Sequence, residues 1–303
     1  MQLFILSRDR WDYSPTVDTM PAEAMTFVTV MVPKDQYKQY RASPNFKGLT
    51  IECWPDYVDC VPKKRRYLYE KVKGAYMVID DDLGIQVWSS RDQKYVPANS
   101  KPTLFMSKLD RMWDRLDTAD IGTVGATNTF MASKRIKENG GQTVWPGLVP
   151  FCFAGFGADR PKIKWRTFFF TDIAMPMQIM KQGGTSVTDF SIAYSMRNNK
   201  KLQTTGTSVY RDEATIKYSA LALAKTVPGH VFGLKDTGNN GGGWSLQKTF
   251  TRPNLSRSNQ WISGFLDQEG LTHVPRTVDL TLKTPMAELF ANYKESWEQA
   301  QED

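Results

Sequence analysis

Residues 75–88 read AYMVIDDDLGIQVW, and this segment carries the strongest indication of the fold class. Ala75 to Ile79 are mostly apolar and predict a buried strand, and three aspartates follow this strand without a break. A short apolar run bounded by polar residues is typical of a buried strand in an α/β sheet. In open sheets of this class, ligands bind at the carboxyl ends of the strands. Asp80, Asp81 and Asp82 therefore mark a candidate site.

The sequence before this stretch predicts alternating strands and helices. Strands are expected over residues 3–7, 25–32 and 48–54. Pro62 and Lys63 open a basic helix that Gly74 ends. This order of elements favours an α/β fold of Rossmann-like type, with a mostly parallel sheet flanked by helices.

The second half of the chain carries weaker signals. Residues 165–170 are aromatic and predict a strand, which a helix opening at Thr171 and Asp172 follows. Residues 237–259 are rich in glycine and basic residues and predict a mobile loop, and an acidic amphipathic helix is expected over residues 285–303.

Composition excludes several classes of protein. Three cysteines without metal-type spacing and two histidines argue against a Cys/His zinc site and a His-based hydrolase triad. Neither GxGxxG after the first strand nor GxxxxGK[ST] is present, so a dinucleotide fold and a P-loop NTPase are disfavoured. No export signal or membrane-spanning run is expected, and the chain is expected to be cytoplasmic with reduced thiols.

The aspartate triplet points to a divalent cation. Three adjacent carboxylates repel one another unless a cation lies among them, and hard cations such as Mg²⁺ or Mn²⁺ take oxygen ligands. Asp80 and Asp82 point the same way along an extended chain, so both can serve one site. The metal would offset charge on a leaving diphosphate. An exposed acidic turn is the alternative.

Other charged residues follow predicted strands or begin helices. Asp172 either caps its helix or acts as a general base toward an acceptor hydroxyl. Basic side chains at predicted strand ends and helix starts suit phosphate groups. These are Arg8, Arg10, Lys64, Arg65 and Arg66.

Five stretches in order resemble the GT-A glycosyltransferases. They are FILSRDR (4–10), VTVMVPKDQYKQYR (28–41), KKRRYLYEKVKGAYMVIDDDLGI (63–85), FFFTDIAMPMQIMKQGG (168–184) and RDEATIKYSALALAKTVPGHV (211–231). The resemblance is closest to the phage-type, TET-associated group that glycosylates hydroxymethylated DNA bases. It covers roughly residues 1–235 with a long unmatched middle, and the order of the motifs carries it.

The resemblance implies a GT-A fold and a set of site residues. Asp80 and Asp82 would hold the metal and the ribose-diphosphate, with His230 as a further metal ligand, and Asp172 would act in the acceptor site. Thr171 stands where many relatives have an acid, which leaves the general base and the stereochemistry open. The implied nucleotide-sugar contacts are Ser7, Arg8, Arg10, Arg65, Asp80 and Asp81.

The resulting hypothesis is sugar transfer from a UDP-sugar to 5-hydroxymethylcytosine in DNA, with Mn²⁺ or Mg²⁺. A single domain is expected, with a nucleotide-sugar half (1–120) and an acceptor half (121–303) that holds the basic loop and the C-terminal helix. The net charge is +7, and residues 160–260 carry fifteen Lys/Arg against five Asp/Glu, which suits DNA. The candidate DNA contacts are Lys162, Lys164, Arg166, Lys200, Lys201, Lys248, Arg252 and Arg257.

Three alternatives remain open from the sequence. The first is a glycosyltransferase acting on a surface glycan or a small molecule. The second is a nucleotidyltransferase, which uses similar acids. The third is a non-catalytic DNA-binding protein with a GT-A core, against which the clustered aspartates argue.

Overall fold

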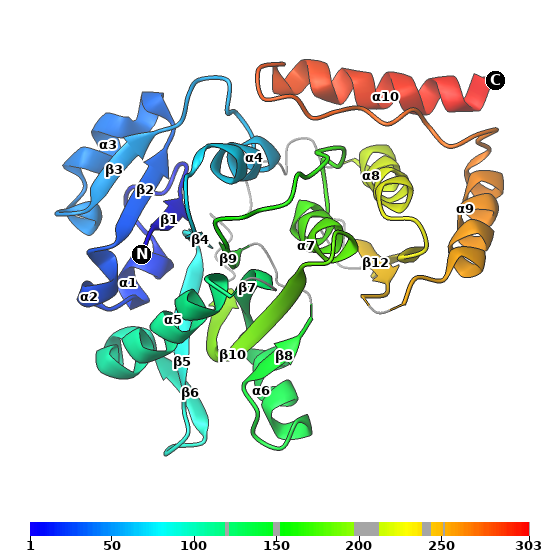
Figure 1. Cartoon of the computed structure of the whole chain (residues 1–303). Helices are drawn as coiled ribbons and strands as arrows, with labels where there is room; N and C mark the ends of the chain where they lie inside the picture. Colours follow the sequence, from blue (N-terminus) through cyan, green and yellow to red (C-terminus); the bar gives the residue numbers. More distant parts are fainter. Residues whose placement is uncertain (119–120, 148–151, 197–211, 238–243, 251, 303) are drawn as a thin grey trace.

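The computed structural model describes residues 1–118, 121–147, 152–196, 212–237, 244–250 and 252–302 (Figure 1). Most described strands form one large sheet in the order β3-β2-β1-β4-β9-β7-β10-β5-β6, with β8 pairing β10. A separate hairpin, β11-β12, lies beside α9. The predicted α/β fold, a large sheet flanked by helices, is confirmed.

The first part of the sheet is parallel. Its strands are β1 (Leu3–Leu6), β2 (Val28–Val32), β3 (Thr50–Cys53) and β4 (Tyr76–Asp80). The register pairs Leu3 with Val28 and Leu6 with Asp80. Because these strands run the same way, their carboxyl ends share one edge, and the aspartate triplet lies there beside the end of β1.

The remainder of the sheet mixes parallel and antiparallel pairs. Its strands are β5 (Leu83–Ser89), β6 (Lys94–Pro97), β7 (Ile121–Asn128), β8 (Val144–Pro146), β9 (Phe153–Phe156) and β10 (Thr185–Met196). β10 is parallel to β7 and antiparallel to β5, so β10 and β7 also end at the edge that carries the triplet. Beside this sheet lies the antiparallel hairpin of β11 (Val231–Asp236) and β12 (Trp244–Lys248).

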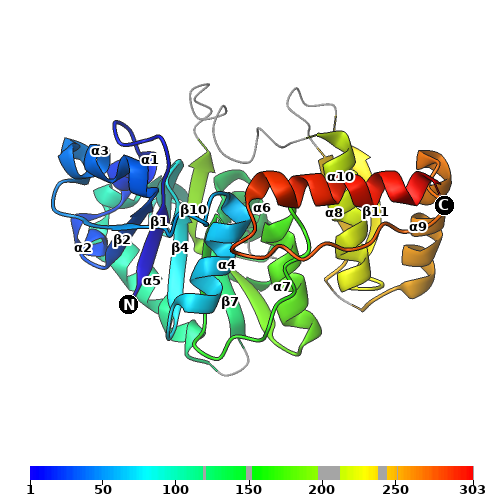
Figure 2. The same ribbon diagram turned by 90° about the horizontal axis from the view of Figure 1, so that it is seen from above.

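Helices cover both faces of the sheet (Figures 1 and 2). The α-helices are α1 (Pro15–Thr19), α2 (Ala22–Met25), α3 (Tyr37–Ala42), α4 (Val61–Lys71), α5 (Pro102–Leu116), α6 (Thr129–Glu138), α7 (Thr171–Lys181), α8 (Glu213–Thr226), α9 (Leu255–Glu269) and α10 (Met286–Glu302). Short 3-10 turns span Lys34–Gln36, Pro44–Phe46 and Ala98–Ser100. None of the described helices is long and apolar enough to span a membrane.

Alternation along the strands divides the core into two layers. Met77 and Ile79 of β4 pack in the same cluster as Phe105 of α5, on one face of the sheet. Tyr76 and Val78 pack on the other face, in a cluster that includes side chains of α4, α7, α8 and α10. Both faces of the strand are buried, which explains its continuous apolar sequence.

A buried ion pair fastens the C-terminal helix to α4. The Lys63 side chain is fully buried, lies 2.8 Å from the Asp59 carboxylate and donates to the carbonyl of Thr284 at 2.5 Å. The other carboxylate oxygen of Asp59 accepts the backbone N–H of Met286, the first residue of α10, at 3.0 Å. This cluster joins the start of α10 to the loop before α4.

Two sequence predictions in the second half are wrong. Residues 165–170 form no strand: Trp165 and Phe168 are buried in a cluster to which several helices contribute, and the Trp165 carbonyl accepts from the Leu280 N–H. Residues 237–259 are not one loop, because β12 and the start of α9 lie within them; residues 238–243 and 251 are outside the described residues. An apolar or glycine-rich run does not reveal its pairing partner.

Candidate functional site

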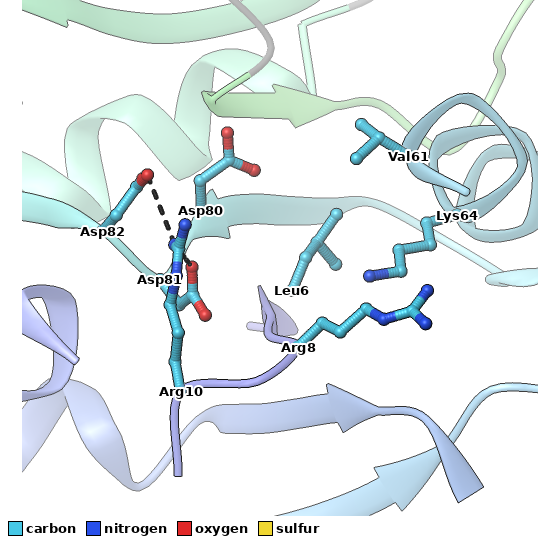
Figure 3. A pocket seen from close by; sticks show the side chains of 8 residues that line it. All are labelled: Leu6, Arg8, Arg10, Val61, Lys64, Asp80, Asp81 and Asp82. Atoms are coloured by element: carbon cyan, nitrogen blue, oxygen red, sulfur yellow. Dashed lines mark hydrogen bonds and ion pairs between the residues drawn. The ribbon is translucent and has the colours of Figure 1, made fainter. Parts of the chain in front are cut away.

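A pocket of about 160 Å³ lies at the carboxyl edge of β1 and β4. It is lined by Leu6, Arg8, Arg10, Val61, Lys64, Asp80, Asp81 and Asp82. Figure 3 shows the aspartates and Arg10 on one side and the cationic groups of Lys64 and Arg8 on the other. The pocket therefore has an acidic side and a basic side.

Asp81 is the structural member of the triplet. Its buried carboxylate accepts hydrogen bonds from Ser7 and pairs with Arg10, and its carbonyl accepts from Ser14 Oγ at 2.9 Å. Burial raises the pKa of Asp81 to about 6, and the Arg10 guanidinium opposes this rise. Ser7 is buried and its hydroxyl donates to Asp81, so it holds the Asp81 carboxylate in place and is not exposed to a ligand.

Asp80 and Asp82 point away from Asp81 (Figure 3). The Asp80 carboxylate makes no hydrogen bond or ion pair with the described residues, while its backbone N–H is held by the Cys152 carbonyl at 2.8 Å. Burial raises the pKa of Asp80 to about 7 despite the Arg65 guanidinium, which lowers it. Asp82 lies 3.3 Å from Arg10. Both residues line the pocket, although Asp81 and Asp82 form a turn after β4 and the chain is not extended there as the sequence analysis assumed.

The turn after β1 depends on Asp9. Asp9 has a φ of 59°, a left-handed conformation that is uncommon outside glycine, and its backbone N–H donates to the Gln36 side chain at 2.8 Å. Arg10 on one side of it reaches the aspartates, and Arg8 on the other donates to the Asp59 carbonyl at 3.3 Å. The strained residue therefore lies between two arginines that line the pocket.

The four consecutive basic residues of α4, Lys63 to Arg66, point in different directions, because helical neighbours are about 100° apart. Lys64 lines the pocket and is buried, which lowers the pKa of its ammonium to about 8 against the opposing charge of Asp81. Arg65 instead donates to Thr171 Oγ1 at 2.6 Å, and Arg66 pairs with Glu70. The pocket residue is Lys64, whereas the resemblance implies Arg65.

The described residues contain no group of three His, Cys, Asp or Glu side chains arranged to hold a metal ion. His230 is not near the aspartates: it follows α8, outside the pocket lining, and its Nδ1 lies 3.0 Å from the Thr249 carbonyl. The expectation of His230 as a metal ligand is wrong for this structure, because the turn after α8 places it against the β12 end.

A second pocket, of about 270 Å³, surrounds Asp172. Asp172 lies in the first turn of α7, where the helix dipole favours a carboxylate. The residue that precedes the helix, at the N-cap position, makes no side-chain hydrogen bond to it. That residue, Phe170, has a φ of 61°. Asp172 is therefore available to the pocket rather than used as a helix cap.

Arg65, Cys152 and Tyr194 lie between the two pockets. The positive charge of Arg65 lowers the pKa of Asp80, and its guanidinium donates to Thr171, the neighbour of Asp172. The Cys152 thiol donates to the Tyr194 hydroxyl at 2.9 Å, and both Asp80 and Asp172 help raise the pKa of each group, after burial. The structure thus brings Asp80 and Asp172 to one edge. Sequence reasoning missed Cys152 and Tyr194, which sit in no recognisable motif.

The predicted DNA contacts lie on several separate segments of the structure. Lys162 and Lys164 are exposed on the segment that follows Arg160, which donates to the Gly74 carbonyl at the amino end of β4, away from the aspartates. Arg166 is paired with Asp279 at 3.1 Å. Arg252 and Arg257 are exposed near the β11-β12 hairpin, with Arg257 over the Phe232 ring at 3.9 Å. Lys248 lines the second pocket, and Lys200 and Lys201 lie outside the described residues.

No family model matches the chain, and no curated protein matches it. Among solved structures, it is similar to glucosyl-3-phosphoglycerate synthase from Mycobacterium tuberculosis, in complex with Mn²⁺, UDP and glucosyl-3-phosphoglycerate, at 11% identity and a TM-score of 0.41, over 84% of this chain and 91% of that one. It is also similar to a mannosyltransferase from Pyrobaculum calidifontis with GDP-Man and Mn²⁺, at 12% identity and a TM-score of 0.39, over 74% and 63%. Likenesses this distant do not carry the assignment, which rests on the site.

Proposed function

We propose that this protein is a metal-dependent glycosyltransferase of GT-A type that takes its sugar from a UDP-sugar. The observation that carries the proposal is the divided pocket at the sheet edge: Asp80 and Asp82 face it from one side and Lys64 from the other. A nucleoside diphosphate held by a divalent cation requires carboxylates for the metal and a cation for the phosphates.

The donor set fits a hard cation. Asp80 and Asp82 supply oxygen ligands, and Mg²⁺-type ions are commonly held by one or two carboxylates, with substrate phosphates and water completing the shell. A bound cation would supply Lewis-acid stabilisation of the leaving diphosphate. Asp81 stays with Ser7 and Arg10 and keeps the turn after β1 in register with β4.

Asp172 is the proposed general base. It would take the proton from the acceptor hydroxyl as that oxygen forms its bond to the sugar and the bond from the sugar to the diphosphate breaks. Support comes from its position: it faces the second pocket, and its charge reaches Cys152 and Tyr194, which Asp80 also influences. In this division of labour residues 1–120 carry the donor site and residues 121–303 the acceptor site.

The finer proposal is that the acceptor is a hydroxymethylated pyrimidine in DNA. Its support is the basic composition of residues 160–260, the exposure of Arg252 and Arg257, and the presence of Lys248 in the lining of the Asp172 pocket. DNA binding through phosphates should weaken steeply as salt rises, because bound counterions are released.

The test is transfer from UDP-glucose with Mn²⁺ to DNA containing 5-hydroxymethylcytosine, against unmodified DNA, followed by mass spectrometry. One hexose gained per modified base, and lost in Asp82→Ala, supports both parts of the proposal. Slow donor hydrolysis without any gain in DNA mass overturns the acceptor and keeps the enzyme class. Absence of binding to every nucleotide-sugar tried overturns the class, and turnover of nucleoside triphosphates instead would indicate a nucleotidyltransferase.

A further inference from the structure

A groove of about 420 Å³ lies between α8, α9 and the β11-β12 hairpin, and we call it the α9 groove. It shares only Trp244 with the Asp172 pocket and no residue with the pocket at the aspartates. Its volume falls within the range of sites that take small ligands, about 300–1,000 Å³. Four aromatic rings, three glutamine amides and a cluster of two carboxylates and one ammonium line it, and the proposed transfer reaction uses none of the polar groups among them.

Aromatic rings lie on both walls of the α9 groove. Trp261 and Phe265, four residues apart on one face of α9, have ring centres 5.5 Å apart, and Phe232 and Trp244 belong to the hairpin. Arg257 covers the Phe232 ring at 3.9 Å, and Phe265 is buried. The ring surfaces that a ligand can reach are therefore those of the two half-buried tryptophans, one on each wall.

Gly264 opens the helical wall between the rings. It lies inside α9, where glycine is less favourable than every other residue except proline. A Cβ atom at this position would meet no packed neighbour within 4 Å, and the backbone is not left-handed there, so neither close packing nor conformation requires glycine. The fold therefore gives no reason for glycine at position 264, and the effect of its missing side chain is to leave the groove open.

The glutamines give the groove free donors and acceptors. Gln247 comes from β12, and Gln260 and Gln268 come from the same face of α9 as Trp261. Their side-chain amides make no hydrogen bond with the other described residues. Each amide has two N–H donors and a carbonyl that accepts, so a ligand between the walls meets both kinds of partner.

The charged cluster of the groove is negative overall. The Lys217 ammonium lies 2.6 Å from Glu213 and 2.7 Å from Glu269, and it lies 5.7 Å from the centre of the Trp244 ring. Two carboxylates and one ammonium leave a net charge of −1, which disfavours phosphates and other anions. Carboxylate oxygens also have lone pairs beyond those that the lysine uses, and these require donors. The groove therefore suits an uncharged ligand that carries hydrogen-bond donors.

We propose that the α9 groove binds a neutral oligosaccharide, at a site separate from the pocket at the aspartates. A pyranose ring has an apolar C–H face that packs flat on an aromatic ring, and its edge carries hydroxyl groups that both donate and accept. Trp244 and Trp261 would contact the ring faces, and the glutamines and carboxylates would contact the hydroxyls. Nucleic acids are disfavoured by the negative cluster, and a proline-rich peptide lacks the N–H donors that the carboxylates require.

The experiment begins with an array of neutral oligosaccharides of glucose, galactose, mannose and N-acetylglucosamine, probed with the full chain without UDP or Mn²⁺. The tightest ligand is then titrated by calorimetry. Gly264→Leu is expected to weaken binding about tenfold or more, because its side chain would occupy the groove, and to raise the melting temperature, because leucine favours the helix. Trp261→Ala is expected to weaken binding about tenfold or more, since buried apolar contact is lost.

The matched controls are Ser263→Leu, an exposed position on α9 outside the groove lining, and Trp145→Ala, an exposed tryptophan on β8. Binding that is lost in Gly264→Leu at an unchanged or raised melting temperature, and kept in both controls, supports the inference. Because Gly264→Leu keeps the helix, its result decides even if Trp261→Ala fails to fold.

Four outcomes overturn the inference. They are absence of binding to every oligosaccharide of the array, unchanged binding in Gly264→Leu, equal loss in Ser263→Leu, and binding of decaproline without binding of any sugar. A loss in Lys248→Met with full binding in Gly264→Leu would place the sugar in the Asp172 pocket instead. UDP affinity is measured separately with Asp82→Ala, so a failure of the proposed donor site is distinct from a failure at the α9 groove.

Discussion

The two pockets are built in different ways. The donor-side pocket, which Asp80, Asp82 and Lys64 line, is formed by short sequence segments at the ends of adjacent parallel strands. In it, the Asp81 carboxylate accepts from Ser7 and pairs with Arg10. The Asp172 pocket is assembled from α7, α8 and a distant hairpin, and its walls are mostly rings. The first is a local product of strand order, whereas the second depends on tertiary packing. Under the proposed function, the first pocket would bind the charged groups of the donor and the second would recognise the shape of the acceptor.

The largest expected effect is at Asp82. Asp82→Ala should lower sugar transfer on the order of a thousandfold, because loss of Lewis-acid stabilisation removes several kcal/mol of transition-state binding. Steady-state kinetics with a Mn²⁺ titration measure it. Asp110→Asn, an exposed carboxylate on α5, is the control. Full activity in Asp82→Ala would show that the pocket at the aspartates does not hold the metal that transfer requires.

Asp172→Asn should lower transfer about a hundredfold or more while leaving UDP affinity unchanged, because general-base catalysis contributes on that scale. The split between kcat and donor binding separates the two pockets directly. Glu138→Gln, a carboxylate on α6, serves as the matched control. Loss of UDP affinity in Asp172→Asn would show that the pockets are not separate in function.

Lys64→Met should weaken UDP binding about tenfold or more, since a hydrogen bond to a charged group is lost. The same variant should be more stable near pH 7, by on the order of 2 kcal/mol, because the buried ammonium has a pKa of about 8, below its value of 10.5 in the unfolded chain. The unfolded chain binds the proton more tightly, so the wild type gains stability as pH rises from 8 toward 10.5, and the variant should lack that gain. Denaturant unfolding at pH 7 and pH 9.5 checks the sign, with Lys71→Met as the control.

The smallest effects are expected at exposed basic residues. Arg252→Gln should weaken DNA binding modestly and reduce the slope of log K against log salt by about one, as loss of one phosphate contact predicts. Lys162→Gln should change neither quantity, because Lys162 lies toward the amino end of β4. Filter binding over a salt series distinguishes them. Equal effects of the two variants would extend the DNA surface around both sides of the sheet.

Sequence reasoning reached the donor-side pocket more fully than the other. The apolar run before the three aspartates predicts a buried strand, and the aspartates mark its carboxyl end. Asp80 and Asp82 could therefore be placed at the edge of the sheet from the sequence alone. The choice of Lys64 over Arg65 could not be, since it depends on how α4 is rotated against the sheet. The strand that carries Trp244 was not predicted for a different reason: it exists by pairing with β11, and the glycine-rich sequence before it is typical of a loop. Ser7 was predicted to contact the nucleotide-sugar, but it is buried and its hydroxyl donates to Asp81.

The fastening of α10 has a consequence for how the protein is made. The ribosome adds Thr284 and Met286 long after strands β1 to β4. The Thr284 carbonyl nevertheless accepts from Lys63, and the Met286 N–H donates to the Asp59 carboxylate. The Asp59 carbonyl in turn accepts from Arg8, which lines the pocket. A nascent chain that stops before Thr284 leaves the buried Lys63 ammonium with the Tyr57 carbonyl and the Asp59 carboxylate but without the Thr284 carbonyl. Formation of the pocket at the carboxyl edge of β1 and β4 is thereby coupled to synthesis of Thr284 and α10, so translation products that lack them should fail to retain UDP on an affinity column even though every residue lining that pocket is already present.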